Sequence, residues 1–193
     1  MSTNSAVRVG LAAGLLLMGL LALSSTAAAE IVYTPVNVTI SGTGSFKLDL
    51  DHDGVNDFLL RSVAKVTACG NRGGFMGSTK ITPTAGDGVV VSHLNFAAVL
   101  ASGAPVDGSS TFYPKKAIVT QFFLCPSGSE SVSGYLGLEF QINGQTHYGW
   151  AQVNIHASYG GRGSGDMEST LLGFAYETIA GRTIEAGQTS GKF

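Results

Sequence analysis

The segment YLGLEFQINGQTHYGWAQVNI, at 135–155, constrains the fold more than any other part of the chain. Asn143 and Gly144 separate two runs in which apolar and polar residues alternate. This dipeptide is the strongest short signal for a hairpin with a type I′ turn. A two-residue turn fixes the register of the strands, so Ile142 is expected opposite Gln145. One face of the hairpin is then apolar and is expected to pack in the core.

Runs of strand length recur along the rest of the chain, at 31–40, 44–50, 57–69, 117–125 and 169–177. The glycine-rich stretches 70–80 and 159–169 are expected to be loops. The segment 89–104 begins as a strand, but it contains HLNFAAVLA, which is compatible with one short helix. Many short strands at this spacing predict a single all-β domain, a jelly-roll-like β-sandwich with at most one short helix.

The first 29 residues have the layout of a secretory signal peptide. Arg8 is followed by an apolar run of 16 residues and then by an A-x-A site that ends at Ala29. A retained membrane anchor is the alternative, but the run is shorter than the roughly 20 residues that a spanning helix needs. We therefore expect cleavage before Glu30. The domain at 30–193 would then be exported, to the periplasm or the cell exterior, and free of the membrane.

The expected mature chain is weakly acidic. Of the 11 Lys and Arg residues only Arg8 precedes the cleavage point, so ten remain against 13 Asp and Glu, a net charge of −3. This balance gives no electrostatic signal for binding nucleic acid or an anionic membrane. Lys115 and Lys116 form the only basic pair in the sequence, and a solvated turn explains it.

The chain has two cysteines, Cys69 and Cys125. An even number of cysteines in an exported protein favours a disulfide bond, and two separate buried thiols are the alternative. Neither cysteine has a histidine nearby in the sequence, so a catalytic thiol is not expected.

The segment LDLDHDGVNDFLL, at 48–60, concentrates charge in a chain that carries little of it. Its four carboxylates are those of Asp49, Asp51, Asp53 and Asp57. Calcium takes six to eight oxygen ligands, and a glycine at positive φ, here Gly54, lets the backbone wrap around an ion. The pattern predicts a calcium site whose ligands are the four carboxylates and the main-chain carbonyl of Val55.

An EF-hand is excluded, because its twelfth position counted from Asp49 should be a bidentate glutamate and is Leu60 here. A calcium loop between two strands fits better and is similar to the cation loops of integrin-like propeller repeats. The alternative is a solvated acidic turn without an ion, since Asp and Gly favour turns. The mutual repulsion of four carboxylates favours the ion, in a structural role that fixes the start of the next strand.

The polar face of the hairpin carries aromatic and hydrogen-bonding side chains, namely Tyr135, Glu139, Tyr148, Trp150 and Gln152. If exposed, they form a flat carbohydrate-binding platform, because aromatic rings stack on sugar rings while amides and carboxylates bind hydroxyl groups. The alternative is that Trp150 covers Gly137 or lies beneath a neighbouring loop as part of a second small core.

Three segments together resemble a family of exported bacterial proteins that often carry a C-terminal PEP-CTERM sorting signal. They are LDLDHDGVNDFLL, YLGLEFQINGQTHYGWAQVNI and TLLGFAYETIAGRTIEAG, in this order. The resemblance implies export and a β-rich domain with a cation loop at 49–57, and it implies no established activity. The chain ends in GQTSGKF, without that signal, so release or periplasmic residence is expected in place of surface anchoring.

Signals for an enzyme are weak. The chain contains no G-x-S-x-G and no H-E-x-x-H, and its histidines are scattered, so no catalytic residue is assigned. The sequence predicts an exported, calcium-stabilised β-sandwich with a non-catalytic binding or extracytoplasmic structural role, whose partners are polysaccharide or other surface components. The alternatives are a carbohydrate-binding module that uses Tyr135, Tyr148 and Trp150, and a secreted hydrolase with a site built from loops.

Overall fold

The computed structural model describes residues 30–161 and 163–191, so the expected signal peptide lies outside the described residues. Within these ranges the chain forms strands and turns and no helix. The strands are β1 (Ile31–Ser41), β2 (Gly44–Leu48), β3 (Phe58–Cys69), β4 (Arg72–Pro83), β5 (Gly88–His93), β6 (Phe96–Ala97), β7 (Val99–Leu100), β8 (Pro105–Val106), β9 (Phe112–Tyr113), β10 (Ala117–Leu124), β11 (Gly128–Ile142), β12 (Gln145–Gly161), β13 (Ser164–Glu177) and β14 (Ile184–Glu185).

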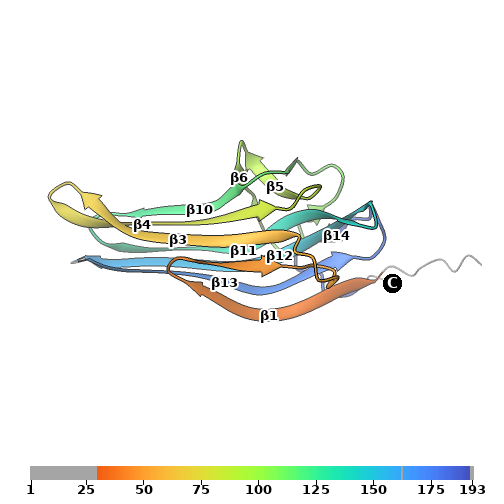
Figure 1. Cartoon of the computed structure of the whole chain (residues 1–193), viewed down its shortest axis with the longest axis horizontal. Coiled ribbons are helices and arrows are strands. Elements are labelled where there is room, and N and C mark those ends of the chain that lie inside the picture. Colours follow the sequence, from red (N-terminus) through yellow and green to blue (C-terminus); the bar gives the residue numbers. More distant parts are fainter. Residues whose placement is uncertain (1–29, 162, 192–193) are drawn as a thin grey trace, which may run out of the picture.

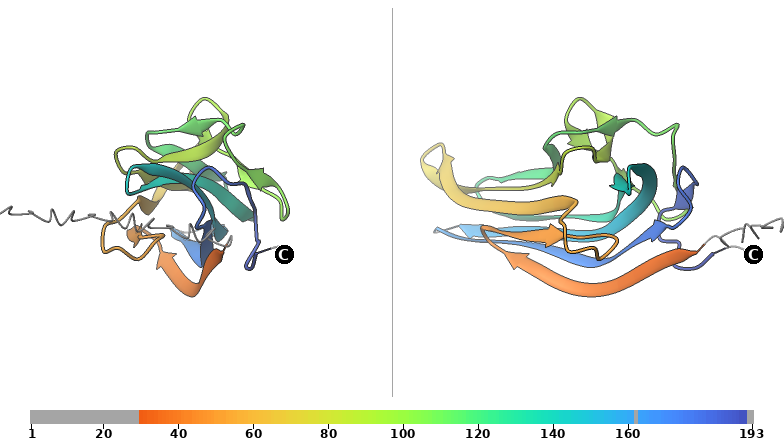
Figure 2. Two further views of the ribbon diagram at one scale, coloured as in Figure 1. Left: turned by 90° about the vertical axis from the view of Figure 1, so that its right-hand side faces the viewer. Right: turned by 45° about the vertical axis from the view of Figure 1, so that its right-hand side comes forward.

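A sheet of twelve strands folds over itself into two layers, which Figures 1 and 2 show from three directions. Its order is β1-β13-β12-β11-β5-β6-β10-β4-β3-β2, with β7 paired to β11 and β9 paired to β5. One layer consists of β1, β13, β12 and β11, the other of β10, β4, β3 and β2, and β5 and β6 connect them. The strands at the two ends of this order, β1 and β2, follow each other in sequence, so the sheet is nearly closed. The all-β sandwich expected from the sequence is confirmed.

The hairpin at 135–155 forms in the predicted register. Asn143 and Gly144 have φ angles of 52° and 75°, the positive values that a type I′ turn requires. Ile142 pairs with Gln145, and the pairing continues without a shift along the whole of β11. Local turn chemistry therefore determines the alignment of the two longest strands.

Most of the two glycine-rich stretches expected to be loops is strand, in β4 for 70–80 and in the end of β12 and the start of β13 for 159–169, so that prediction is wrong for those residues. A Cβ atom on Gly165 would collide with the ring of Phe75, and one on Gly73 would collide with the hydroxyl group of Tyr159. The glycines therefore lie where aromatic side chains approach a neighbouring backbone closely, which is a known use of glycine inside strands. Composition alone does not distinguish this use from a flexible loop.

The segment 89–104, for which a strand and a short helix were both compatible, forms the short strands β5, β6 and β7. Val89 and Ala97 are buried in the main core. Leu94, between β5 and β6, has a φ of 46° and is 81% exposed. The chain therefore turns back on itself at Leu94, where a helix would have continued.

The main core lies between the two layers, and its largest fully buried side chains include Phe58, Phe75, Phe140 and Tyr159. A second, smaller core covers the outer side of the layer that contains β11, β12 and β13. Strands β8 and β14 pair with each other there. The buried members of the second core are Ile31, Val90, Val106, Tyr148, Trp150, Ala175 and Ile184.

Three buried hydroxyl groups connect the layers inside the main core. Ser62 Oγ on β3 lies 2.6 Å from Ser169 Oγ on β13, and Thr79 Oγ1 on β4 lies 2.7 Å from the same atom. Each hydroxyl can donate one hydrogen bond and accept others, so the three groups satisfy one another without water.

The predicted disulfide bond between Cys69 and Cys125 is present. It joins the end of β3 to the residue that follows β10. Figure 1 places the turn between β3 and β4 at one end of the sandwich and the loop between β2 and β3 at the other. The disulfide and the aspartate loop therefore lie at opposite ends of the molecule.

Candidate metal centre

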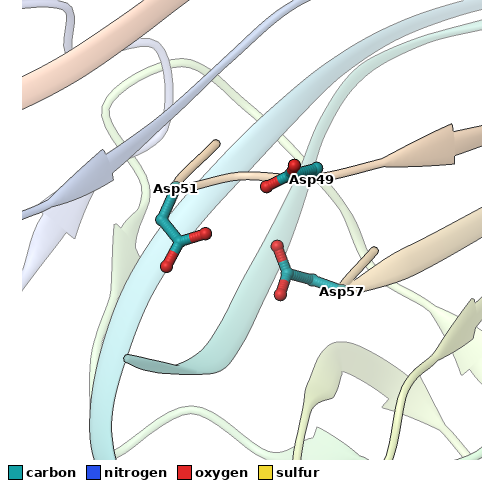
Figure 3. Close-up of side chains that lie close together, drawn as sticks. All are labelled: Asp49, Asp51 and Asp57. Carbon is teal, nitrogen blue, oxygen red and sulfur yellow. The ribbon is translucent and has the colours of Figure 1, made fainter. Parts of the chain in front are cut away.

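The loop between β2 and β3 brings three of the four predicted carboxylates together. Asp49, Asp51 and Asp57 each offer one oxygen atom, and these atoms lie within 4.8 Å of one another. Figure 3 shows the three side chains converging on a common space. Two oxygens bound to one calcium ion at about 2.4 Å are at most about 4.8 Å apart. The three carboxylates, defined here as the aspartate group, therefore fit a single ion.

Main-chain hydrogen bonds close the loop around this group. The N–H of Asp57 donates to the carbonyl of Leu48 at 2.9 Å, and the N–H of Leu50 donates to Asp57 Oδ2 at 2.7 Å. Gly54 has a φ of 89°, the conformation expected of it, and its N–H donates to Asp49 Oδ2 at 2.9 Å. Asp49 and Asp57 are thereby oriented by main-chain donors on the two arms of the loop.

One carboxylate oxygen of the aspartate group has no partner. Asp49 Oδ1 is inaccessible to solvent and accepts no hydrogen bond from the described residues. Leaving a buried acceptor unsatisfied costs roughly 1–3 kcal/mol, and more when the group is charged. A cation between the carboxylates offers this atom a ligand bond and also offsets the charges of Asp51 and Asp57.

Asp53 and Val55 take different positions from the aspartate group. Asp53 is exposed, and its Oδ1 accepts a hydrogen bond from the N–H of Val55 at 2.7 Å, so it caps its own turn. The side chain of Val55 is 59% exposed, and ligation through its carbonyl stays a prediction. His52 lies in the same loop, and its Nε2 is 2.8 Å from Thr34 Oγ1.

The electrostatics of the loop follow from burial and from repulsion between carboxylates. Burial raises the pKa of Asp57 to about 6, against the hydrogen bond from Leu50, which lowers it. The charges of Asp51 and Asp49 raise it further. Burial also raises the pKa of Asp51. The repulsion that the sequence predicted is therefore present in the fold.

The sequence analysis missed a further carboxylate beside this loop, that of Asp87. Asp87 is 5% exposed, and burial, with a contribution from the charge of Asp57, raises its pKa to about 7. The turn at 84–87 is attached to the aspartate loop, because the N–H of Thr84 donates to the carbonyl of Asp57 at 2.7 Å. In the sequence Asp87 lies between two glycines, which is indistinguishable from an ordinary exposed turn.

We predict that the calcium-free protein becomes less stable as the pH rises from about 5 to about 7.5. The folded-state pKa values of Asp57 and Asp87 are raised to about 6 and about 7, whereas an unfolded Asp has a pKa near 3.9. In this window the folded state binds more protons than the unfolded state, so the free energy of unfolding falls with pH. Thermal melts in chelator measure the effect. Asp87→Asn is expected to flatten the profile, and a wild-type melting temperature that rises with pH contradicts the prediction.

The aromatic side chains on the polar face of the hairpin lie in the second core. Trp150 is 1% exposed and Tyr148 is 7% exposed. The indole N–H of Trp150 donates to the carbonyl of Gln188 at 3.0 Å, and the ring of Tyr135 packs edge-on against the indole at a centroid distance of 5.2 Å. The arrangement matches the second-core alternative. In the described structure a sugar ring has no access to Trp150.

The two polar residues predicted for the same face, Glu139 and Gln152, are half-buried. Glu139 lies opposite Tyr148 in the hairpin register, and Gln152 lies opposite Tyr135. Burial raises the pKa of Glu139. Both side chains therefore border the second core and do not form an open ligand platform.

A serine and a histidine on the outer side of the sheet are hydrogen-bonded to each other. Ser131 Oγ lies 2.9 Å from His156 Nδ1, and Glu168 is the register partner of His156 on β13. Among the described residues Glu168 forms no ion pair with this imidazole. A hydrolytic triad requires a third group that orients the histidine, so this pair does not support the hydrolase alternative.

Comparisons of this chain with protein-family models, curated proteins and solved structures gave no match. None of the described residues belongs to a helix with the length and apolar character needed to cross a membrane.

Proposed function

We propose that this protein is an exported β-sandwich stabilised by calcium, with a non-catalytic binding or structural role outside the cytoplasm. The observation that carries the proposal is the aspartate group, in which Asp49, Asp51 and Asp57 converge and Asp49 Oδ1 is buried without a partner. Calcium is the favoured ion because the donors are all oxygens and all come from protein side chains in one loop between strands.

The position of the aspartate group supports a structural role for the ion. Asp57 directly precedes β3, and its carbonyl accepts the hydrogen bond from Thr84 at the end of β4. An ion bound to Asp49 and Asp57 would hold the end of β2 beside the start of β3. It would therefore stabilise the pairing of β2 with β3 at the outer edge of the layer formed by β2, β3, β4 and β10.

Two observations support the proposed export. The segment before Glu30 has the layout of a signal peptide, and the described domain contains the disulfide bond between Cys69 and Cys125. Disulfide bonds persist in oxidising compartments and are rare in the cytosol. Fractionation of cells that express the full chain tests this part of the proposal, and a soluble cytoplasmic product with its N-terminus intact contradicts it.

Calcium is expected to raise the free energy of unfolding by about 2.7 kcal/mol at a hundredfold excess over the Kd. For a domain of this size the melting temperature should rise by about 5–10 °C. Asp49→Asn is expected to abolish the increase, because the amide oxygen can still accept the hydrogen bond from Gly54 while the nitrogen replaces a ligand oxygen. The measurement is differential scanning calorimetry of residues 30–193 in chelator and in millimolar calcium.

Two matched variants complete the calcium experiment. Asp166→Asn removes one negative charge from an exposed position on β13 and should leave the calcium effect intact. Asp53→Asn should reduce the effect less than Asp49→Asn, because Asp53 lies outside the aspartate group. If wild type melts at the same temperature in chelator and in calcium, the proposed ion is eliminated.

A further inference from the structure

The strands of the two layers of the sandwich carry charges of opposite sign. Strands β2, β3 and β4 of one layer contain Lys or Arg but no Asp or Glu, and β10 beside them contains none of these four residue types. Strands β11 and β13 of the other layer contain Asp and Glu but no Lys or Arg, and β1 and β12 contain none of these four residue types. The net charge of the chain does not reveal this separation, because the positive charges of one layer and the negative charges of the other nearly cancel.

The cations of the first layer gather on its outer side, turned away from the main core. This basic face consists of Lys47, Leu59, Arg61, Val63, Lys65, Lys80, Thr82 and Lys116. In Figure 1 it is the side of β3, β4 and β10 that points away from β11, β12 and β13. None of its cations forms an ion pair with a carboxylate in the part of the chain that the structure describes.

The register of the sheet places two of these cations directly against each other. Arg61 on β3 is the cross-strand partner of Lys80 on β4. Like charges at directly opposed positions destabilise a sheet, and no carboxylate on either neighbouring strand relieves this pair. Ser45 is the next partner of Arg61, and Ile118 is the next partner of Lys80. The arrangement is unfavourable for the free protein and becomes favourable when an anion lies across it.

The same pair lies in a depression with an apolar floor. The depression has a volume of about 330 Å³ and is lined by Leu59, Arg61, Val63, Lys80, Thr82 and Lys116. Its rim therefore offers one guanidinium and two ammonium groups. A guanidinium binds a carboxylate or a sulfate through two parallel hydrogen bonds, and ammonium groups add charge-assisted bonds.

We propose that the basic face binds an acidic polysaccharide, with an anionic sugar unit in the depression between Arg61 and Lys80. A polymer is favoured over a small anion because the cations extend across the sheet. Arg61 and Lys65 alone are about 13 Å apart along β3, so a single small anion reaches only part of the face. The proposal is independent of the calcium site, and its choice of a glycan over an intracellular polyanion rests on the proposed export.

Other anionic macromolecules fit the face less well. The overall charge of the chain is negative, which weakens its attraction to a densely charged duplex or an anionic bilayer. Phe123 is the one aromatic side chain on the outer side of β10 that is substantially exposed, at 53%. Single-stranded nucleic acids need a series of such rings for stacking. A glycan with separated carboxylates matches cations that are spaced along neighbouring strands.

The test is affinity electrophoresis of residues 30–193 through gels containing polygalacturonate, with unmodified dextran as the uncharged control. Chelator is present throughout, so that bound calcium cannot bridge two carboxylates. Wild type is expected to be retarded by polygalacturonate only, and the retardation should weaken between about 50 and 200 mM salt. Arg61→Gln with Lys80→Gln should reduce the affinity about tenfold or more.

A matched double variant, Arg72→Gln with Arg182→Gln, removes two cations that lie outside the depression and should retain most of the affinity. The Arg61→Gln, Lys80→Gln protein should melt at or above the wild-type temperature, because the opposed charges are gone. If that protein fails to fold, Lys47→Gln with Lys65→Gln should show a smaller loss of affinity in the same direction.

Several outcomes overturn the proposal. They are absence of retardation by polygalacturonate, equal losses in the two double variants, and equal or tighter binding of duplex DNA or phosphatidylglycerol vesicles. A salt-sensitive dimer without glycan that Arg61→Gln with Lys80→Gln dissociates would assign the face to a second copy of the chain. Because chelator is present, failure of the calcium proposal leaves this result unaffected.

Discussion

Replacing Trp150 with alanine is expected to destabilise the protein by about 3–5 kcal/mol and to lower its melting temperature by about 6–20 °C. The side chain is 1% exposed and packs between Tyr33 and Tyr135. Its removal leaves a cavity in the second core and frees the carbonyl of Gln188, which accepts the indole N–H. The chain around β14 should then exchange its amide hydrogens faster than the rest of the domain.

Trp150→Phe provides the control for this prediction. It keeps most of the apolar volume and removes the hydrogen bond to Gln188, so a loss of about 1–2 kcal/mol is expected. Trp150 is the only tryptophan in the chain, so urea unfolding of the variants should be followed by circular dichroism. Wild-type stability in Trp150→Ala, combined with lost binding to a neutral polysaccharide, would instead support the exposed platform considered from the sequence.

The parts of the fold that were predicted residue by residue depend on short-range chemistry. The register of β11 and β12 follows from the Asn143-Gly144 turn, because two residues leave only one pairing. The aspartate loop was also recognisable, since its carboxylates and Gly54 lie within a few positions of one another. Even there the sequence did not distinguish Asp53 from Asp51. Both accept a hydrogen bond from the N–H two residues further on, but only Asp51 belongs to the aspartate group.

The parts that were not predicted depend on contacts between distant segments. The sequence left two alternatives open for Trp150, an exposed platform and a place in a second small core, because the segments that cover it, around β8 and β14, are distant from it in sequence. Asp87 becomes a neighbour of Asp57 only because the end of β4 docks on the aspartate loop. Arg61 and Lys80 meet because β4 pairs with β3 along its whole length, including a stretch whose glycines suggested a loop. Long-range pairing therefore determined both the misassigned strands and the unrecognised basic face.

Removing the disulfide bond, by Cys69→Ser with Cys125→Ser, is expected to cost about 4 kcal/mol of stability through the larger entropy of the unfolded chain. The estimate follows from a sequence separation of 56 residues between the two cysteines. The strand β4 lies between β3 and β10 in the sheet, so no direct strand pairing replaces the bond. The melting temperature should fall by about 8–16 °C. Reductant should produce the same fall in wild type and no further change in the double variant.

The disulfide and the aspartate loop stabilise opposite ends of one sandwich, so their contributions should add. Sites without shared partners usually combine within about 0.5 kcal/mol. We therefore expect calcium to stabilise Cys69→Ser with Cys125→Ser by the same free energy as it stabilises wild type, at equal excess over the Kd. Calorimetry of both proteins, each in chelator and in calcium, measures the two calcium-dependent changes in the free energy of unfolding that are to be compared. If calcium no longer stabilises the variant without the disulfide, the two sites are energetically coupled. Because neither site contacts the other directly, the coupling would have to pass through the strands that connect the two ends.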